Sequence, residues 1–407
     1  MQKFIYKVRN QEGRVFSGVL EAEDARTLRS KLREKGFYVT SVAPYFEIKK
    51  FFGLGSLRVS LDTLTVFTHQ LCSTLEAGMP ILQALDALWN STDNPRMQVI
   101  ISQLRNKLAT GSSFAQAMED FPETFPVIFR SSMSVAESGA GVVPILKRLG
   151  EYFEAQREFN AQIKRATVYP AFVVFFSMAV VVFMLTFVVP TFQKVFVKLR
   201  VALPAVTQFV IYLSGVARNP ISWVLLAGLC IGAFVFYQTV KKTAQGRLML
   251  DRVKLRLPLF GKIIYFSCIE RIMRSLSLLL SSGVPMITSF NTTRDIVLNA
   301  ELEQLLEGAT KSISEGVSVT EALRETKRFP PFVIELVALG EHTGTLYETM
   351  GKAAQYMKEE LNTRIHRFLT LLEPLLIIFV GGIVLFLLLS VYMPIMTLWR
   401  TLPNMRT

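Results

Sequence analysis

The sequence predicts a mainly α-helical, polytopic membrane protein with two duplicated cytoplasmic helical bundles, three transmembrane helices and a small N-terminal α+β module. One reason is an internal repeat, because LCSTLEAGMPILQAL at 71–85 returns as LSLLLSSGVPMITSF at 276–290, an offset of 205 residues. Solenoid repeats have periods of roughly 20–50 residues, so this longer offset indicates a duplicated domain. The second reason is that residues 166–193, 219–240 and 374–399 contain no charged side chain.

The repeat preserves residues that end helices and form turns. At the offset of 205 the matched pairs are Gly78 with Gly283, Pro80 with Pro285, and Gly111 with Gly316. After a single-residue gap the offset becomes 204, and it pairs Glu137 with Glu341, Ala140 with Gly344, and Pro170 with Pro374. The match continues into the first and third charge-free stretches. Each copy is therefore expected to lead into its own membrane helix.

Residues 1–48 predict a separate ββαβ module. The segments FIYKV and VFSGVLEA alternate apolar and polar side chains on either side of NQEG at 10–13, which is typical of two strands joined by a turn. Ala25, Leu28 and Leu32 then follow at helical spacing, and Gly36 is a candidate C-cap. The short extended segment YVTSV completes the module. Residues 49–60 are expected to be a linker.

Residues 61–168 predict the first helical bundle. One apolar face ends at the AGMP turn at 77–80, and it consists of Leu61, Leu64, Phe67, Leu71 and Leu75. Asn94-Pro95 opens a helix over 95–109, and Ser113 is placed to cap the short helix that follows. Residues 238–373 have turn-forming and helix-capping residues at the equivalent positions and predict the second bundle. Each copy is expected to form about six helices.

Three transmembrane helices are predicted at 169–189, 221–237 and 374–393, because about 20 apolar residues suffice to cross a hydrocarbon core of ~30 Å. The beginning, MQKFIYKVRNQEGR, is polar and charged, unlike a secretory signal peptide, so the N-terminus is expected to stay where it is made. The loop 190–220 and the tail 394–407 are then on the side of the membrane opposite the bundles.

Basic residues near the spans predict the orientation. Fourteen lysines and arginines flank the spans on the side of the two bundles, and six lie on the opposite side. The positive-inside rule therefore places both bundles and the N-terminus in the cytoplasm. The net charge of +13 is concentrated beside the membrane, where it attracts anionic headgroups. Nucleic acid is not an expected partner.

No catalytic, cofactor-binding or metal site is predicted. The sequence lacks GxxxxGK[ST], HExxH and GxSxG motifs, and Cys72, Cys230 and Cys268 are isolated from one another. The spans also lack charged residues, whereas a membrane transporter, the alternative class of function, needs polar groups in the midplane. We therefore expect a protein that is not an enzyme and has no cofactor.

Two features leave alternatives open. Glu137 and Glu341 precede glycines at equivalent helix ends, where each either caps backbone amides or binds a partner or a cation. Glu373-Pro374 is interpreted as the N-terminus of the third span, where the carboxylate caps the helix and the proline occupies its first turn.

The ordered motifs resemble those of the platform proteins of type II secretion and type IV pilus assembly (GspF/PilC). An F-x-R-x-L pattern followed by A-G-x-P resembles Phe67-Thr-His-Gln-Leu71 with Ala77-Gly-Met-Pro80, and Arg274 occupies the arginine position in the second copy. The family's G-E-x-[ST]-G-x-L signature is similar to Gly340-Glu-His-Thr-Gly-Thr-Leu346. The E-P pair before the last span matches Glu373-Pro374. The resemblance extends over essentially the whole chain.

The resemblance implies a non-enzymatic scaffold in the inner membrane. Its implied partners are a cytoplasmic secretion or assembly ATPase, pilin-like subunits, other inner-membrane assembly components and the phospholipid bilayer, and it implies a homo-oligomer. Type II secretion is the expected system, with type IV pilus biogenesis as the alternative. The motif residues with expected structural or interaction roles are Gly78, Pro80, Gly111, Glu137, Arg274, Gly283, Pro285, Gly316, Glu341, Gly344, Glu373 and Pro374.

Overall fold

The computed structural model describes residues 2–9, 15–22, 24–34, 38–44, 59–198, 204–258 and 260–401. It consists of two units, Met1–Val59 and Ser60–Thr407, which are described here separately. Several predicted features lie outside the described residues, namely the turn at 10–13, the Gly36 cap, the linker up to residue 58 and the tail beyond residue 401.

The first unit has the predicted ββαβ order. Strands β1 (Gln2–Arg9), β2 (Val15–Ala22) and β3 (Tyr38–Pro44) form an antiparallel sheet in the order β2-β1-β3, and α1 spans Ala25–Glu34. The register of β1 against β3 shifts between Lys7 and Val8. Leu28 and Leu32 of α1 are buried, as their helical spacing predicts.

The first bundle is confirmed as helical throughout. It contains α2 (Leu61–Glu76), α3 (Ile81–Ser91), α4 (Pro95–Ala109), α5 (Phe114–Met118), α6 (Val127–Val135) and the first half of α7 (Val142–Phe183). A short π-helical turn, η2 (Ala136–Ala140), joins α6 to α7. Leu64, Phe67 and Leu71 of the predicted apolar face are buried. Phe67 begins a chain of ring contacts that continues through Phe125, Phe129 and Phe153.

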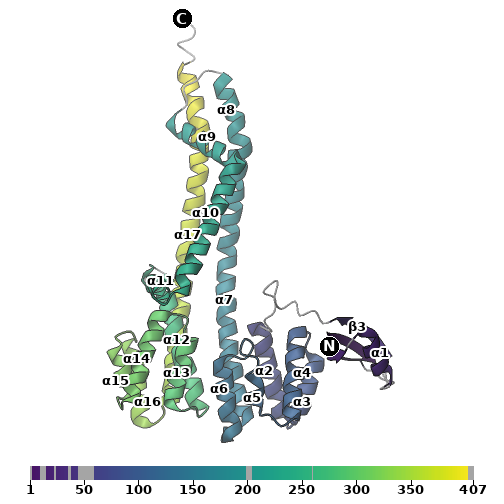
Figure 1. Ribbon diagram of the computed structural model, residues 1–407. Coiled ribbons are helices and arrows are strands. Elements are labelled where there is room, and N and C mark those ends of the chain that lie inside the picture. Colours follow the sequence, from purple (N-terminus) through teal and green to yellow (C-terminus); the bar gives the residue numbers. More distant parts are fainter. Residues whose placement is uncertain are drawn as a thin grey trace. The chain divides into compact units, whose positions relative to one another are not determined.

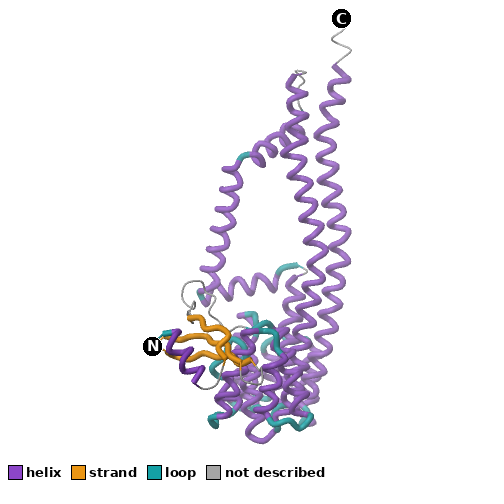
Figure 2. Tube along the Cα trace, turned by 90° about the vertical axis from the view of Figure 1, so that its right-hand side faces the viewer, coloured by secondary structure: helices purple, strands orange, loops and turns teal. Residues whose placement is uncertain are grey.

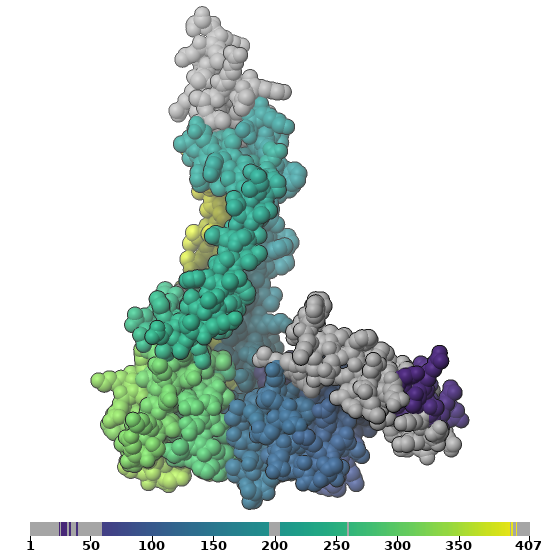
Figure 3. All heavy atoms as spheres, in the orientation of Figure 1, coloured from purple at the N-terminus to yellow at the C-terminus, as the bar shows by residue number. Residues whose placement is uncertain are grey.

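The second bundle repeats the first in order and register. It contains α12 (Phe260–Ser281), α13 (Met286–Ile296), α14 (Ala300–Ser314), α15 (Val319–Glu325), α16 (Pro331–Thr343) and the first half of α17 (Leu346–Thr401). Helices α13, α14 and α15 each begin 205 residues after α3, α4 and α5. Figure 3 shows the two bundles meeting side by side, the first in blue and the second in green. The duplication predicted from the sequence is therefore a duplication of structure.

Three helical segments are long and apolar enough to cross a membrane, as predicted: Val142–Lys194, Pro220–Lys242 and Leu346–Ser390. The first and last are not separate membrane helices. Helices α7 and α17 each begin in a bundle and run on into the apolar stretch, while α10 (Pro220–Lys242) is confined to its span (Figure 1). The side chains of these stretches are largely exposed, as lipid-facing side chains are.

The segment 190–220, expected as a loop, is largely helical where it is described. The short π-helical turn η3 (Met184–Val188) precedes the segment, which contains most of α8 (Val189–Lys198) and then α9 (Ala205–Arg218). Helix α9 packs on α17, where the Thr207 hydroxyl donates to the Ser390 carbonyl at 2.8 Å. Val210 is buried beside Val189 and Leu387. The apolar positions of α9 thus form a small cluster near the outer ends of the spans.

The interpretation of Glu373-Pro374 as a helix N-terminus is wrong. Both residues lie inside α17, which is continuous from Leu346 to Thr401. Pro170 occupies the equivalent interior position of α7. A proline inside a helix removes one backbone hydrogen bond and crowds the preceding turn. Membrane-spanning helices tolerate it, because neighbouring groups and small local adjustments satisfy the freed carbonyl.

Candidate functional site

Glu341 stabilises the N-terminus of the short helix α15 from a distance of 22 residues along the chain. Its carboxylate accepts hydrogen bonds from the Val319 amide at 2.6 Å and from the Thr320 amide at 2.9 Å. The Thr320 hydroxyl donates a third bond at 2.5 Å. Burial alone raises the pKa of this carboxyl, but the bonds from Thr320 and Val319 outweigh it, so the pKa of Glu341 is lowered.

Glu137 makes the same arrangement in the first bundle. It accepts from the Phe114 amide at 2.5 Å and from the Ala115 amide at 3.1 Å, at the start of α5. Ser113 adds a capping box with Gln116 at that helix end. The two glutamates thus cap backbone amides, which is one of the two alternatives that the sequence leaves open. In each bundle they tie the end of the fifth helix to the start of the fourth.

The two copies differ immediately after these glutamates. In the second copy α16 ends with Gly344 in the left-handed conformation (φ 72°), a common C-cap geometry. The first copy has Ala140 at this position, and a Cβ atom disfavours left-handed backbone. The positive φ angles fall instead on Gly139 and Gly141, on either side of the alanine, and the chain forms the π-helical turn η2.

The other motif glycines and prolines form equivalent turns in the two bundles. Gly78 and Gly283 have φ angles of 83° and 82°, and the prolines two residues later are the N-caps of α3 and α13, Pro80 and Pro285. Gly111 and Gly316, with φ angles of 94° and 95°, follow the third helix of each copy, at the ends of α4 and α14. These residues are spread over separate turns and do not converge on one site.

Arg274 lies where the two copies meet. It ion-pairs with Glu270 (Nε to Oε1, 2.5 Å) on the same helix and borders a cavity of about 220 Å³. The lining comes from α7 of the first copy and from α12 and α17 of the second. Glu158 and Lys358 form a second ion pair at the edge of the cavity, at 3.2 Å. Arg271 also lines the cavity, and among the described residues it forms no ion pair.

Direct contacts join the two bundles around this cavity. Arg148 of α7 donates to the carbonyl of Ser281, at the end of α12. Tyr152 of α7 is buried and its hydroxyl lies 3.4 Å from the hydroxyl of Ser275. The turn at Gly283 faces Val135 of α6. The first and second bundles therefore form one continuous packed body, which the sequence did not predict.

A second hollow lies among apolar residues at the membrane level. It measures about 420 Å³ and is bordered by α7, α9 and α17, with Gly382 among its lining residues. No atom lies within 4 Å of where a Cβ of Gly381 or Gly382 would stand. The lining is almost entirely apolar, so the hollow suits hydrocarbon and lacks the polar groups of an ion path.

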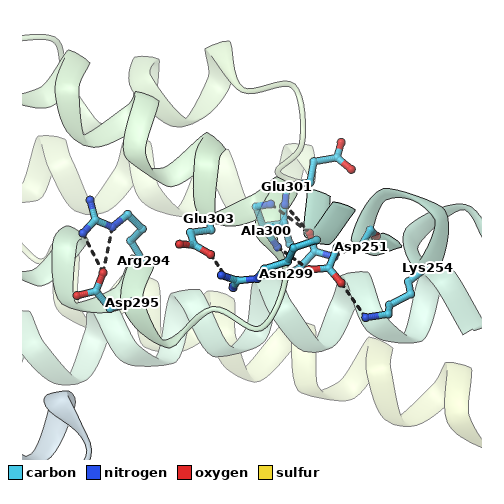
Figure 4. A network of polar contacts seen from close by, with 10 residues as sticks. Asp251, Lys254, Arg294, Asp295, Asn299, Ala300, Glu301 and Glu303 are labelled. Carbon is cyan, nitrogen blue, oxygen red and sulfur yellow. Dashed lines mark hydrogen bonds and ion pairs between the residues drawn. The ribbon is translucent and has the colours of Figure 1, made fainter. Parts of the chain in front are cut away.

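A polar network around Asp251 was not predicted from the sequence. Asp251 lies on α11 (Ala244–Arg256), a helix between α10 and the second bundle, and its side chain is buried against the start of α14 (Figure 4). The sequence feature that could have indicated this network is the single aspartate among the basic residues of α11. Within the described ranges there is no cluster of three or more His, Cys, Asp or Glu side chains that could hold a metal ion.

These features define a membrane-anchored scaffold, in which two packed copies of one helical bundle each continue into a membrane span. The chain belongs to the family described as type II secretion system (T2SS), protein F, which matches twice, at residues 67–190 and 272–394. The N-terminal domain of protein F matches residues 1–43. Members of this family are platform proteins of secretion and pilus systems, and this chain is a multi-pass membrane protein of that kind.

Relatives from both systems are similar over nearly their whole length. A type IV pilus assembly protein PilC from Thermus thermophilus is 32% identical over 406 residues, covering 99% of each chain. A type II secretion system protein F from Vibrio cholerae is 30% identical over 403 residues, covering 97% of this chain and 98% of the relative. Another protein F, from Pseudomonas aeruginosa, is 29% identical over 403 residues, covering 98% of this chain and 99% of the relative.

Proposed function

We propose that this chain is the non-enzymatic inner-membrane platform of a type II secretion system, which couples a cytoplasmic assembly ATPase to the growth of a filament of pilin-like subunits. The observation that carries the proposal is that α7 and α17 each begin in a packed bundle and continue into a membrane span. A continuous helix transmits a displacement along its axis, because backbone hydrogen bonds link its successive turns. Force applied to the bundles therefore reaches the membrane-embedded part.

The proposed orientation has the N-terminus and both bundles in the cytoplasm and the C-terminus in the periplasm. It is supported by the basic residues that flank the bundle sides of the spans, such as Lys164, Arg165, Lys241 and Lys242. Alkaline phosphatase fused after Thr407 is expected to be active, and the same enzyme inserted in the exposed turn at Ser314-Glu315 is expected to be inactive. The reverse pattern would refute this orientation.

The coupling is tested by interrupting α17 between the bundle and the span. Insertion of Gly-Ser-Gly-Ser after Thr370 leaves both bundles intact but adds a flexible joint just before the charge-free stretch. We expect recruitment of the ATPase to the membrane to continue and filament assembly to stop. The control inserts the same four residues in the turn at Gly316, which joins α14 and α15 away from the long helix.

Two outcomes of this experiment would refute the proposal. One is normal filament assembly with the α17 insertion, because force would then not pass through this helix. The other is undiminished ATPase recruitment by a chain that lacks both 61–168 and 238–373. If the Gly316 control also lost filament assembly, the experiment would be repeated with shorter insertions at both positions.

Type IV pilus biogenesis is the second candidate, favoured by the 32% identity to a pilus assembly protein over 406 residues. The two systems are separated by complementation. The chain is introduced into one strain that lacks its type II secretion protein F and into another that lacks its pilus platform protein. Restored secretion without pili supports the first proposal, and restored pili without secretion supports the second.

A further inference from the structure

Helix α11 lies immediately beyond a membrane span and crosswise to it. Only Thr243 separates the end of α10 at Lys242 from the start of α11 at Ala244. The Thr243 hydroxyl accepts a hydrogen bond from the Gly246 amide at 3.2 Å. Figure 1 shows α11 end-on, and the view turned by 90° in Figure 2 shows it running across the direction of the long helices. Helix α11 therefore runs across the direction of the span that precedes it.

One face of α11 is held on the second bundle (Figure 4). The buried carboxylate of Asp251 accepts from the Ala300 amide at 3.0 Å, at the N-terminus of α14, and from the Lys254 ammonium at 2.7 Å. The Asn299 side chain donates to the Asp251 carbonyl at 3.2 Å. Arg247 adds an ion pair with Glu303 at 2.8 Å. These contacts fix the rotation of α11 about its axis.

The opposite face presents exposed apolar side chains. Met249, Val253 and Leu257 follow one another every four residues and are 68%, 48% and 45% exposed. At 100° per residue they form a stripe roughly half a turn from Asp251. The stripe is bordered by the exposed Arg256 and by the exposed Arg252, which also lies 3.9 Å from the Glu301 carboxylate. Asp251 is the sole acidic residue between Thr243 and Ser267, and it faces the bundle.

The far end of α11 is held beside another span. Phe260, at the start of α12, packs its ring against Phe368 of α17, with the ring centroids 4.9 Å apart. Phe368 precedes Pro374, the start of the third charge-free stretch, by six residues. The N-terminal end of α11 joins one span, and its C-terminal end is tied to the chain just before another. Both ends are thus held close to the bilayer.

We propose that α11 lies in the interface of an anionic phospholipid bilayer and anchors the second bundle to the membrane surface. Met249, Val253 and Leu257 insert at the boundary between headgroups and acyl chains, and Arg252 and Arg256 bind lipid phosphates. A basic amphipathic helix parallel to the surface combines these two attractions. The proposal rests on the membrane-spanning character of the chain and does not depend on the ATPase or on the filament system.

The test measures the depth of single spin labels on the full-length chain in nanodiscs. Cys72, Cys230 and Cys268 are first replaced by alanine, and a label is attached through Met249→Cys or, as a matched control, Leu339→Cys. Leu339 is a helical residue of the second bundle that is 55% exposed and lies on α16. We expect the label at 249 to be several-fold more accessible to oxygen relative to the aqueous reagent NiEDDA than the label at 339.

Lipid charge and a charge reversal complete the design. The difference between the labels is expected to be larger in bilayers containing phosphatidylglycerol than in pure phosphatidylcholine, and Arg256→Glu should reduce it. Reversal of Arg324 on α15 is the control and should leave it unchanged. Equal accessibility at 249 and 339, or no response to lipid charge, would overturn the proposal. If the label at 249 were poorly accessible to NiEDDA and no more accessible to oxygen than the control label, it would be in contact with protein, and this result would also overturn the proposal.

Discussion

Glu341 and Glu137 are the residues whose geometry is most alike in the two copies. In each copy the carboxylate accepts hydrogen bonds from two successive backbone amides at the start of a short helix. Hydrogen bonds to a charged acceptor contribute about 1.5–3 kcal/mol each when the donors are otherwise unsatisfied. These glutamates therefore hold the fourth helix of each bundle in place, a structural role that needs neither a cation nor a partner.

The first prediction concerns Glu341→Gln. Loss of the charge weakens three hydrogen bonds, and we expect a loss of about 1–3 kcal/mol in the free energy of unfolding. Thermal unfolding of the full-length protein in detergent measures this, with Glu335→Gln as a control because Glu335 is exposed on the same helix. An equal effect of the two substitutions would contradict the capping role.

The second prediction is the pH dependence of that difference. Because the folded-state pKa of Glu341 is below its ordinary value of 4.5, its contribution is fully present above pH 4.5 and is lost as the pH falls through the folded-state pKa. The stability gap between the wild type and Glu341→Gln should therefore be constant near pH 7 and shrink below pH 4.5. If this stability difference increased on acidification, the pKa of Glu341 would not be lowered by folding.

The third prediction uses two glycines whose substitution should have opposite effects. Gly344→Ala places a Cβ on left-handed backbone and should destabilise the protein by about 1–2 kcal/mol. Gly308→Ala lies within α14, where no atom stands within 4 Å of the new Cβ, and should stabilise it by about 0.5–1 kcal/mol. Unfolding temperatures of the two variants test this directly. Shifts of the same sign would show that the backbone at Gly344 is not what requires glycine.

At the scale of elements, the long helices α7 and α17 are the features that connect bundle and membrane. Each has a proline at the same repeat position, Pro170 and Pro374, close to where its charge-free stretch begins. A proline in a helix interior leaves one carbonyl without its usual amide partner. Each long helix is therefore continuous but locally weakened at equivalent points.

The fourth prediction is that Pro374→Ala stiffens α17 at this point. Proline is about 3 kcal/mol less favourable than alanine in a helix interior, so amide exchange over 366–378 should slow substantially. Hydrogen exchange of the full-length chain in nanodiscs measures it. Pro330→Ala is the control, because Pro330 is the N-cap of α16 and lies outside any helix interior. Unchanged exchange in α17 would contradict the idea of a local weak point.

For the whole of the unit from Ser60 onward, the central feature is the packing of one copy against the other. The equivalent residues Tyr152 and Tyr356 show its effect, since Tyr152 is 7% exposed at the junction and Tyr356 is 37% exposed. Two copies of one bundle thus become unequal when they pack. Tyr152 contributes to holding them together, whereas Tyr356 contacts only Phe332 of its own bundle among the ring contacts of the described residues.

The fifth prediction compares these two tyrosines. Tyr152→Ala removes a buried aromatic side chain and should cost about 3–5 kcal/mol, while Tyr356→Ala should cost much less. Limited proteolysis between 243 and 260, together with thermal unfolding, reports whether the bundles separate in the first variant. Equal losses for both variants would show that the junction does not stabilise the protein.

The sequence by itself determined the three apolar stretches, the repeat, and those turns and caps that depend on one local segment. Each depends on local composition or on a backbone angle, so Gly78, Asn94-Pro95 and Ser113 could be assigned from the residues alone. Only the tertiary structure decided that α17 passes through Pro374, that Tyr152 is buried and Tyr356 is not, and that Asp251 fixes α11 on the second bundle. These outcomes depend on contacts between segments far apart in the chain, and equivalent sequences in the two copies carry no local signal of which surface will be covered.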